Sequence, residues 1–165
     1  MKDAWCSDLC EKIIREFPQT PTPNNIVKNR HDDGAMIEQA FLGKGWLDVS
    51  KETIRYNHTA LFFFSDDAFR YYLPAFMMAA IKNEDDDDSG MIIASVVSAL
   101  TGPLDIDSPE KQRFLRRMKG FNVAQSKVII EYLSYVDSKC SDWFAFDEPR
   151  RAIESYWLHG LQKPL

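Results

Sequence analysis

The sequence predicts a single all-helical domain over residues 1–165, an irregular bundle of about seven or eight helices. Two observations support the fold class: apolar residues recur every three to four positions in most segments, and capping or stop residues separate those segments. A third observation, the length and composition of the chain, supports a single domain. A chain of 165 residues with 45% hydrophobic residues is long enough to bury roughly 70% of its unfolded surface in one core.

The N-terminal segment predicts one helix and a linker. Apolar residues follow each other at steps of four in "DAWCSDLCEKIIREF", and the proline-rich "PQTPTPNN" ends the helix. Two short helices are expected in "DDGAMIEQAF" and "SKETIRYN", the second capped by Ser50. The run "HTALFFF" fits either a buried strand or an apolar lead-in to the next helix, and we favour the lead-in.

Residues 65–81, "SDDAFRYYLPAFMMAAI", predict the central helix of the bundle. Ser65 is the expected N-cap, and apolar residues on all sides of the helix indicate a buried position. Pro74 cannot donate a backbone hydrogen bond, and its ring crowds the carbonyl of Arg70. We therefore expect the helix to bend or break in the turn before Pro74.

Arg70 is a charged residue within this apolar pattern. A buried guanidinium needs partners, so we expect Arg70 to be mostly buried and to pair with a carboxylate or with carbonyls freed near Pro74. Buried charges also occur at functional sites. The alternative is therefore that Arg70 holds an anion in a cleft near the Pro74 kink, with Tyr71 or His58 nearby.

Four further helices are expected in the second half of the chain. After the acidic stretch "KNEDDDDSG" come "MIIASVVSAL", "SPEKQRFLRRMKGF", "NVAQSKVIIEYLSYV" and "DEPRRAIESYWLHG". Ser108 is the expected N-cap of the second of these, with a proline at the first helical position. Asn122 and Gln125 have the spacing of a capping box, and Gly160 is expected to end the last helix.

The residue types that metal and catalytic sites require are sparse. The chain has three histidines and none pairs with another at helical ligand spacing, so we expect no metal centre. Cys6, Cys10 and Cys140 leave one thiol without a partner in any intramolecular scheme, which favours reduced cysteines. No glycine-rich phosphate loop or nucleophile elbow is present. The sequence therefore predicts no cofactor and no enzymatic activity.

The charge pattern indicates which partners the chain binds. A net charge of −5 and a pI of about 5.2 disfavour direct nucleic-acid binding. No apolar run approaches the length of a membrane span, and acids interrupt the N-terminal segment, so we expect a cytoplasmic protein without a membrane partner. Acidic residues suit a basic protein partner. The acidic run that we expect to contact it consists of Glu84, Asp85, Asp86, Asp87 and Asp88.

The segment "ALFFFSDDAFRYYLPAFMMAAI" resembles the signature A-L-x-F-L-[ST]-x-x-A-F-R-Y-Y-L-P-A-[FY] of an uncharacterised bacterial family, a domain of unknown function. The resemblance implies an all-helical fold with a family-like core over residues 32–136, and it supplies no catalytic residues. The acidic run and a C-terminal extension depart from the family. The residues that the resemblance marks as a structural motif are Ser65, Phe69, Arg70, Tyr72 and Pro74.

In character the chain is similar to bacterial immunity proteins, because it is small and acidic and lacks a catalytic constellation. We therefore expect it to bind and neutralise a cognate toxin delivered by a neighbouring cell. Such toxins are often basic nucleases, whose surface an acidic protein would match. The alternatives are a small-ligand-binding protein or enzyme with an anion site at Arg70, and a structural subunit of an assembly.

Overall fold

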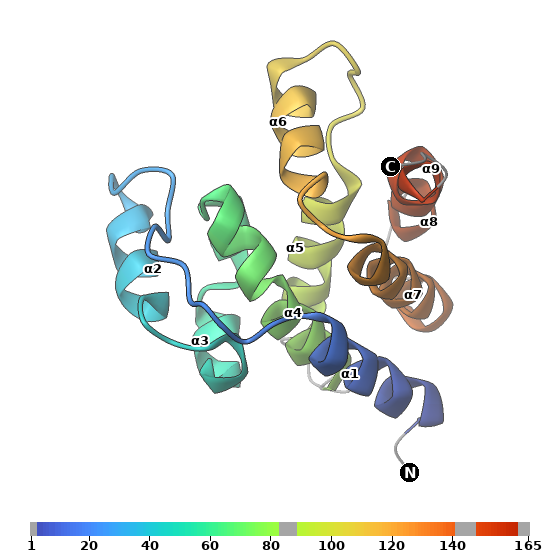
Figure 1. Ribbon diagram of the computed structural model, residues 1–165, viewed down its shortest axis with the longest axis horizontal. Coiled ribbons are helices and arrows are strands. Elements are labelled where there is room, and N and C mark those ends of the chain that lie inside the picture. Colours follow the sequence, from blue (N-terminus) through green and yellow to red (C-terminus); the bar gives the residue numbers. More distant parts are fainter. Residues whose placement is uncertain (1–2, 83–88, 141–147, 162–165) are drawn as a thin grey trace. The chain divides into compact units, whose positions relative to one another are not determined.

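The computed structural model describes residues 3–82, 89–140 and 148–161. Over these residues the chain is helical, and the one strand-like feature is an isolated antiparallel bridge between Val27 and Phe64. The predicted all-helical fold is confirmed (Figure 1). The α-helices are α1 (Ala4–Glu16), α2 (Asp33–Phe41), α3 (Lys51–Tyr56), α4 (Asp66–Lys82), α5 (Ser89–Thr101), α6 (Pro109–Met118), α7 (Val123–Cys140), α8 (Glu148–Ala152) and α9 (Leu158–Gly160).

The chain divides into two compact units, and the boundary between them falls within α5. One unit comprises Phe17–Val96 and contains α2, α3 and α4; it is called the α4 unit below. The other comprises Met1–Glu16 and Val97–Leu165 and contains α1 and α6 to α9; it is called the α7 unit. The prediction of one domain over residues 1–165 covers both units and stays a prediction.

Helix α4 is the most buried helix of its unit. Twelve of its residues are buried, and they cover all sides of the helix as the sequence predicts. The helix continues without interruption from Asp66 through Pro74 to Lys82, so the predicted alternative of a break before Pro74 is wrong. A bend at the same place stays a prediction.

Aromatic rings form the core around α4. The rings of Phe41 and Phe64 meet edge to face with centroids 5.0 Å apart, and the ring of Tyr72 lies 5.1 Å from Phe41 and 5.5 Å from Phe64. Phe76 lies 6.0 Å from both phenylalanines. Edge-to-face pairs of this kind stabilise a core beyond the area that they bury.

The predicted helix caps are confirmed. The hydroxyl of Ser65 accepts a hydrogen bond from the amide of Ala68 at 3.1 Å, and it donates to the carbonyl of Asn25 at 2.6 Å. Ser50 and Ser108 cap α3 and α6 in the same way. In α7, a reciprocal pair of side-chain to backbone bonds joins residues 122 and 125, which is the predicted capping box.

Two short helices precede α4 in the chain. The 3₁₀ helix η1 covers Trp46–Asp48, and η2 covers His58–Phe62. The run "HTALFFF" is therefore mostly a helical lead-in, as favoured, and only its last residue makes the bridge to Val27.

In the α7 unit, α1 packs against α7. The rings of Trp5 and Tyr135 meet edge to face, and Lys12 forms a salt bridge with Glu131 at 2.9 Å. The last predicted helix is in fact three segments, because a π-helical turn over Ile153–Trp157 separates α8 from α9. Its Trp157 donates a hydrogen bond from Nε1 to the carbonyl of Leu100 at 3.0 Å, which satisfies a C-terminal carbonyl of α5.

Candidate functional site

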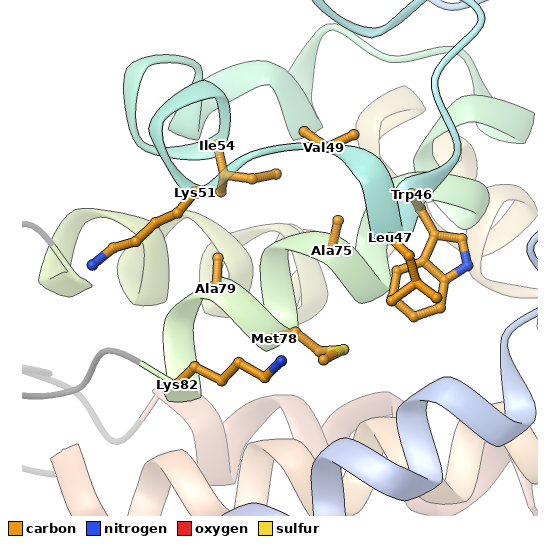
Figure 2. Close-up of a pocket in the computed structure, with 9 residues that line it drawn as sticks. All are labelled: Trp46, Leu47, Val49, Lys51, Ile54, Ala75, Met78, Ala79 and Lys82. Atoms are coloured by element: carbon orange, nitrogen blue, oxygen red, sulfur yellow. The ribbon is translucent and has the colours of Figure 1, made fainter.

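The α4 unit contains a pocket of about 190 Å³ between α4 and the segment that carries η1 and α3 (Figure 2). Figure 2 shows the side chains of Ala75 and Ala79 directed from α4 toward Val49 and Ile54 on the opposite wall. The lining residues are Trp46, Leu47, Val49, Lys51, Ile54, Ala75, Met78, Ala79 and Lys82.

Small residues on α4 create the hollow. Ala75 and Ala79 lie one turn apart, so neither fills the space beneath the η1 segment. The opposite wall is fixed by hydrogen bonds. The backbone amide of Trp46 donates to the hydroxyl of Tyr71 at 3.3 Å, and its indole Nε1 donates to the carbonyl of Pro18 at 3.1 Å. The cap at Ser50 defines where α3 begins.

The pocket is apolar with a basic edge. Seven of the nine lining side chains are apolar, and the other two are Lys51 and Lys82. Sites for drug-sized molecules usually measure about 300–1,000 Å³, whereas an apolar cavity of about 150 Å³ holds a benzene ring. A volume of about 190 Å³ therefore suits one apolar group the size of a leucine or phenylalanine side chain.

Arg70 does not line this pocket. Its Nη2 lies 2.7 Å from Oδ1 of Asp67, one turn earlier on α4, so the predicted pairing with a carboxylate is confirmed. The arginine side chain is 26% exposed, and that of Asp67 is 83% exposed. With 26% of its side chain exposed, Arg70 is mostly buried, as predicted. Asp67 lies in the first turn of α4 and Arg70 lies one turn later, so the pair is near the N-terminal end of the helix.

Tyr71 and His58, the expected neighbours of an anion at Arg70, have other partners. The Tyr71 hydroxyl donates to the carbonyl of Gln19 at 2.6 Å, and burial raises the pKa of Tyr71. Nδ1 of His58 lies 3.0 Å from the hydroxyl of Ser95. Neither residue lines the pocket.

The other residues of the predicted motif contribute to packing. Phe69 and Tyr72 are fully buried. The Tyr72 hydroxyl lies 2.7 Å from the carbonyl of Phe41 and 2.8 Å from that of Lys44, and its one proton is shared between them. Burial raises the pKa of Tyr72 far above its ordinary value. The motif therefore joins α4 to the end of α2 and the turn that follows it.

The predicted partner-binding run, Glu84–Asp88, lies outside the described residues. The sequence nevertheless shows how charge divides between the units. The α4 unit has seven lysines and arginines against twelve aspartates and glutamates, a net charge of −5, and the α7 unit has thirteen of each. The summed charge of the five residues 84–88 is −5, which equals the net charge of the whole chain.

The described part of the chain holds neither a metal-binding cluster nor a membrane-spanning helix. Within residues 3–82, 89–140 and 148–161, no three histidine, cysteine, aspartate or glutamate side chains gather closely enough to hold a metal ion. Within the same residues, no helix has both the length and the apolar character that crossing a bilayer requires.

Sequence reasoning missed the pocket. Its signal was the pair of alanines one turn apart on an otherwise bulky helix, followed by lysine at position 82. The same letters also fit close helix packing, so only the position of the η1 segment distinguishes a hollow from a filled contact.

The chain belongs to DUF6714, a family of unknown function, whose family model matches residues 22–161. The matched span is wider than the expected core of residues 32–136. The matched span includes the C-terminal helices α8 and α9. No curated protein matches the chain, and no solved structure matches it.

Proposed function

We propose that this chain is an immunity protein, which binds and neutralises a cognate bacterial toxin through a surface that includes the pocket of the α4 unit. The observation that carries the proposal is the size of that pocket, about 190 Å³ with a mostly apolar lining. Buried anchor side chains that fill small pockets dominate the affinity of protein interfaces. A pocket for one side chain supports protein binding better than metabolite binding.

Charge supports the same proposal. The net charge of −5 belongs to the unit that contains the pocket, and the acidic run begins two residues after Lys82, which lines the pocket. A basic toxin would be attracted over a distance by the acidic residues and then held by the anchor contact. A nuclease is a suitable candidate, because its phosphate-binding surface is basic.

The test fills the pocket without removing a side chain. The probe is the protein encoded beside this chain's gene, purified with an inactivating substitution. Ala75→Leu places three additional carbons in the pocket, and we expect binding at least tenfold weaker. Ala94→Leu is the matched control, because it makes the same change at an exposed position of α5. Equal affinity for both variants and the unaltered chain would remove the pocket from the proposal.

The contribution of residues 84–88 is a separate prediction. Replacing their carboxylates with amides is expected to slow association at low salt and to have little effect at high salt, because screening removes the attraction between exposed charges. An unchanged association rate at low salt would exclude these residues from the encounter. The immunity proposal itself would then rest on the pocket alone.

A further inference from the structure

The loop that joins α5 to α6 presents two large apolar side chains to solvent. Leu104 is 74% exposed and Ile106 is 71% exposed. The exposed carboxylates of Asp105 and Asp107 alternate with them along the loop. Residues 103–108 are called the LDID loop below. Single exposed apolar residues are common on protein surfaces, but two in one short ordered loop require an explanation.

Hydrogen bonds within the loop fix its shape. The hydroxyl of Ser108 donates to the carbonyl of Asp105 at 2.8 Å, and the backbone amide of Ser108 donates to the same carbonyl at 3.3 Å. The amide of Asp107 donates to Oδ1 of Asp105 at 3.1 Å. These bonds also position Ser108 as the N-cap of α6, so the loop is continuous with a regular helix.

A buried lysine holds the other end of the loop. Lys111 is only 9% exposed, and its Nζ donates to the carbonyl of Pro103 at 3.1 Å and lies 5.2 Å from the centre of the Phe114 ring. The carbonyl accepts a hydrogen bond from the ammonium group, and the face of the ring attracts the same charge. These two contacts of Lys111 hold the Pro103 end of a loop that buries neither Leu104 nor Ile106.

Gly102, which precedes the loop, has a backbone conformation and a close contact that suit glycine. Its φ is +72°, a conformation that residues with a side chain rarely adopt. A Cβ at this position would lie 2.8 Å from atoms of the Phe114 ring. The chain thus leaves α5 by a close turn over the ring of Phe114, and glycine is the residue that this turn accommodates.

We infer that the LDID loop is a second toxin-binding element, which inserts Leu104 and Ile106 into an apolar groove of the toxin bordered by lysine or arginine. This inference rests on the proposed function. Asp105 and Asp107 are complementary to such a border, and a loop that is already ordered loses little conformational entropy on binding. The apolar pair determines how long the complex lasts, and the carboxylates determine how fast it forms.

The experiment measures binding kinetics with the inactivated toxin encoded beside this chain's gene, with the full chain immobilised. Leu104→Ser with Ile106→Ser is expected to raise the dissociation rate at least tenfold. Asp105→Asn with Asp107→Asn keeps an oxygen acceptor at each position, and it is expected to lower the association rate severalfold at low salt only. Val123→Ser with Leu158→Ser is the matched control, because both residues are exposed and lie in the same unit.

The outcomes separate the two proposals. If the toxin binds the unaltered chain and the Leu104/Ile106 variant releases it at an unchanged rate, the LDID loop inference is overturned and the proposed function stands. If the toxin does not bind the unaltered chain, the proposed function fails and the loop inference fails with it. Circular dichroism and thermal unfolding of each variant verify that altered kinetics do not reflect loss of the fold.

Discussion

Residues 65–81 and the LDID loop differ in two respects: how distinctive their sequence pattern is, and how far their apolar side chains are buried. The first has a distinctive pattern, and twelve of its residues are buried in the α4 unit. The second connects two helices and has no distinctive pattern. Its backbone is held by hydrogen bonds, and its Leu104 and Ile106 side chains are exposed to solvent. In this chain, a regular spacing of apolar residues indicates side chains that pack in the core. The exposed loop, which is the surface available to a partner, has no such regular spacing.

The physical reason is the number of neighbours that each residue must satisfy. A buried side chain contacts many others, so its volume and polarity are constrained from every side. An exposed apolar side chain in a free monomer satisfies no neighbour, and any constraint comes from a partner outside the chain. Five predictions follow this contrast from the largest expected effect on stability to the smallest.

Phe64→Ala is expected to have the largest effect, because Phe64 is fully buried among the rings of Phe41, Tyr72 and Phe76. Removing a buried aromatic ring lowers the free energy of unfolding by about 3–5 kcal/mol. Urea denaturation measures the change. Phe62→Ala is the control, since Phe62 is 45% exposed and should lose much less. Similar losses for both variants would contradict the described aromatic core.

Tyr72→Phe is expected to lower the free energy of unfolding by about 1–3 kcal/mol, because two carbonyls, one buried and one partly buried, lose the bond from the hydroxyl, and only the buried one keeps a second bond, from the amide of Lys44. Those carbonyls belong to Phe41 and Lys44. Thermal and urea unfolding measure the loss. Tyr56→Phe provides the comparison, because Tyr56 is 81% exposed and its change should stay within about 0.5 kcal/mol. A neutral or stabilising Tyr72→Phe would show that the hydroxyl does not hold α2 to α4.

Alkaline pH should weaken the same contact. Burial raises the pKa of Tyr72 in the folded state above its ordinary value of 10.0, so above that pH the unfolded chain loses a proton that the folded chain keeps. Stability is therefore fully present below about pH 10 and is lost as the pH rises further, by up to about 1.4 kcal/mol per pH unit for this group.

Urea denaturation on both sides of that pH measures the slope for the unaltered chain and for Tyr72→Phe. The variant should have the shallower slope, because it lacks this titrating group. Tyr71, Tyr132 and Tyr156 also have pKa values raised by burial, so the variant should retain part of the dependence. Identical slopes would mean that Tyr72 ionises as readily in the folded chain as in the unfolded one.

How far the sequence determines the fold can be judged from these residues. The caps at Ser50, Ser65 and Ser108 were predictable because each depends on contacts within a few residues. The burial of α4 was predictable because the helix has apolar residues on all of its sides. The π-helical turn at Ile153–Trp157 was not predicted; its Trp157 bonds to the carbonyl of Leu100, a residue far away in the sequence, and no local pattern contains such a contact.

The candidate sites were less predictable than the fold. Arg70 stood out because its neighbours in sequence are apolar, but it lies one turn after the start of α4 and pairs with the exposed Asp67. The pocket depends on the separation between α4 and the η1 segment, which no local pattern contains. The exposure of Leu104 depends on the turn at Gly102 and on the position of Lys111. A site that is built from segments far apart in the sequence leaves no recognisable motif in any one of those segments.

Arg70→Gln is expected to lower the free energy of unfolding by at most about 1 kcal/mol, because an ion pair one turn apart on a helix contributes little when one partner, here Asp67, is exposed. The variant keeps most of the covered stem and removes the charge. Chemical denaturation at low and high salt measures the loss, which should be smaller at high salt. A loss above about 2 kcal/mol at both salt concentrations would indicate that Arg70 has a structural role beyond its pair with Asp67.

Leu104→Ser with Ile106→Ser is expected to have the smallest effect on stability of the five. Both side chains remain mostly in water in the folded chain, so replacing them removes little buried apolar area, and the free energy of unfolding should change by no more than about 0.5 kcal/mol. The hydrogen bonds that fix the loop come from Asp105, Ser108 and Lys111, which the variant retains. Urea denaturation tests this beside Phe64→Ala. A large loss would mean that the pair packs against the protein itself, and the contrast between a packed motif and an exposed loop would fail where it matters most for binding.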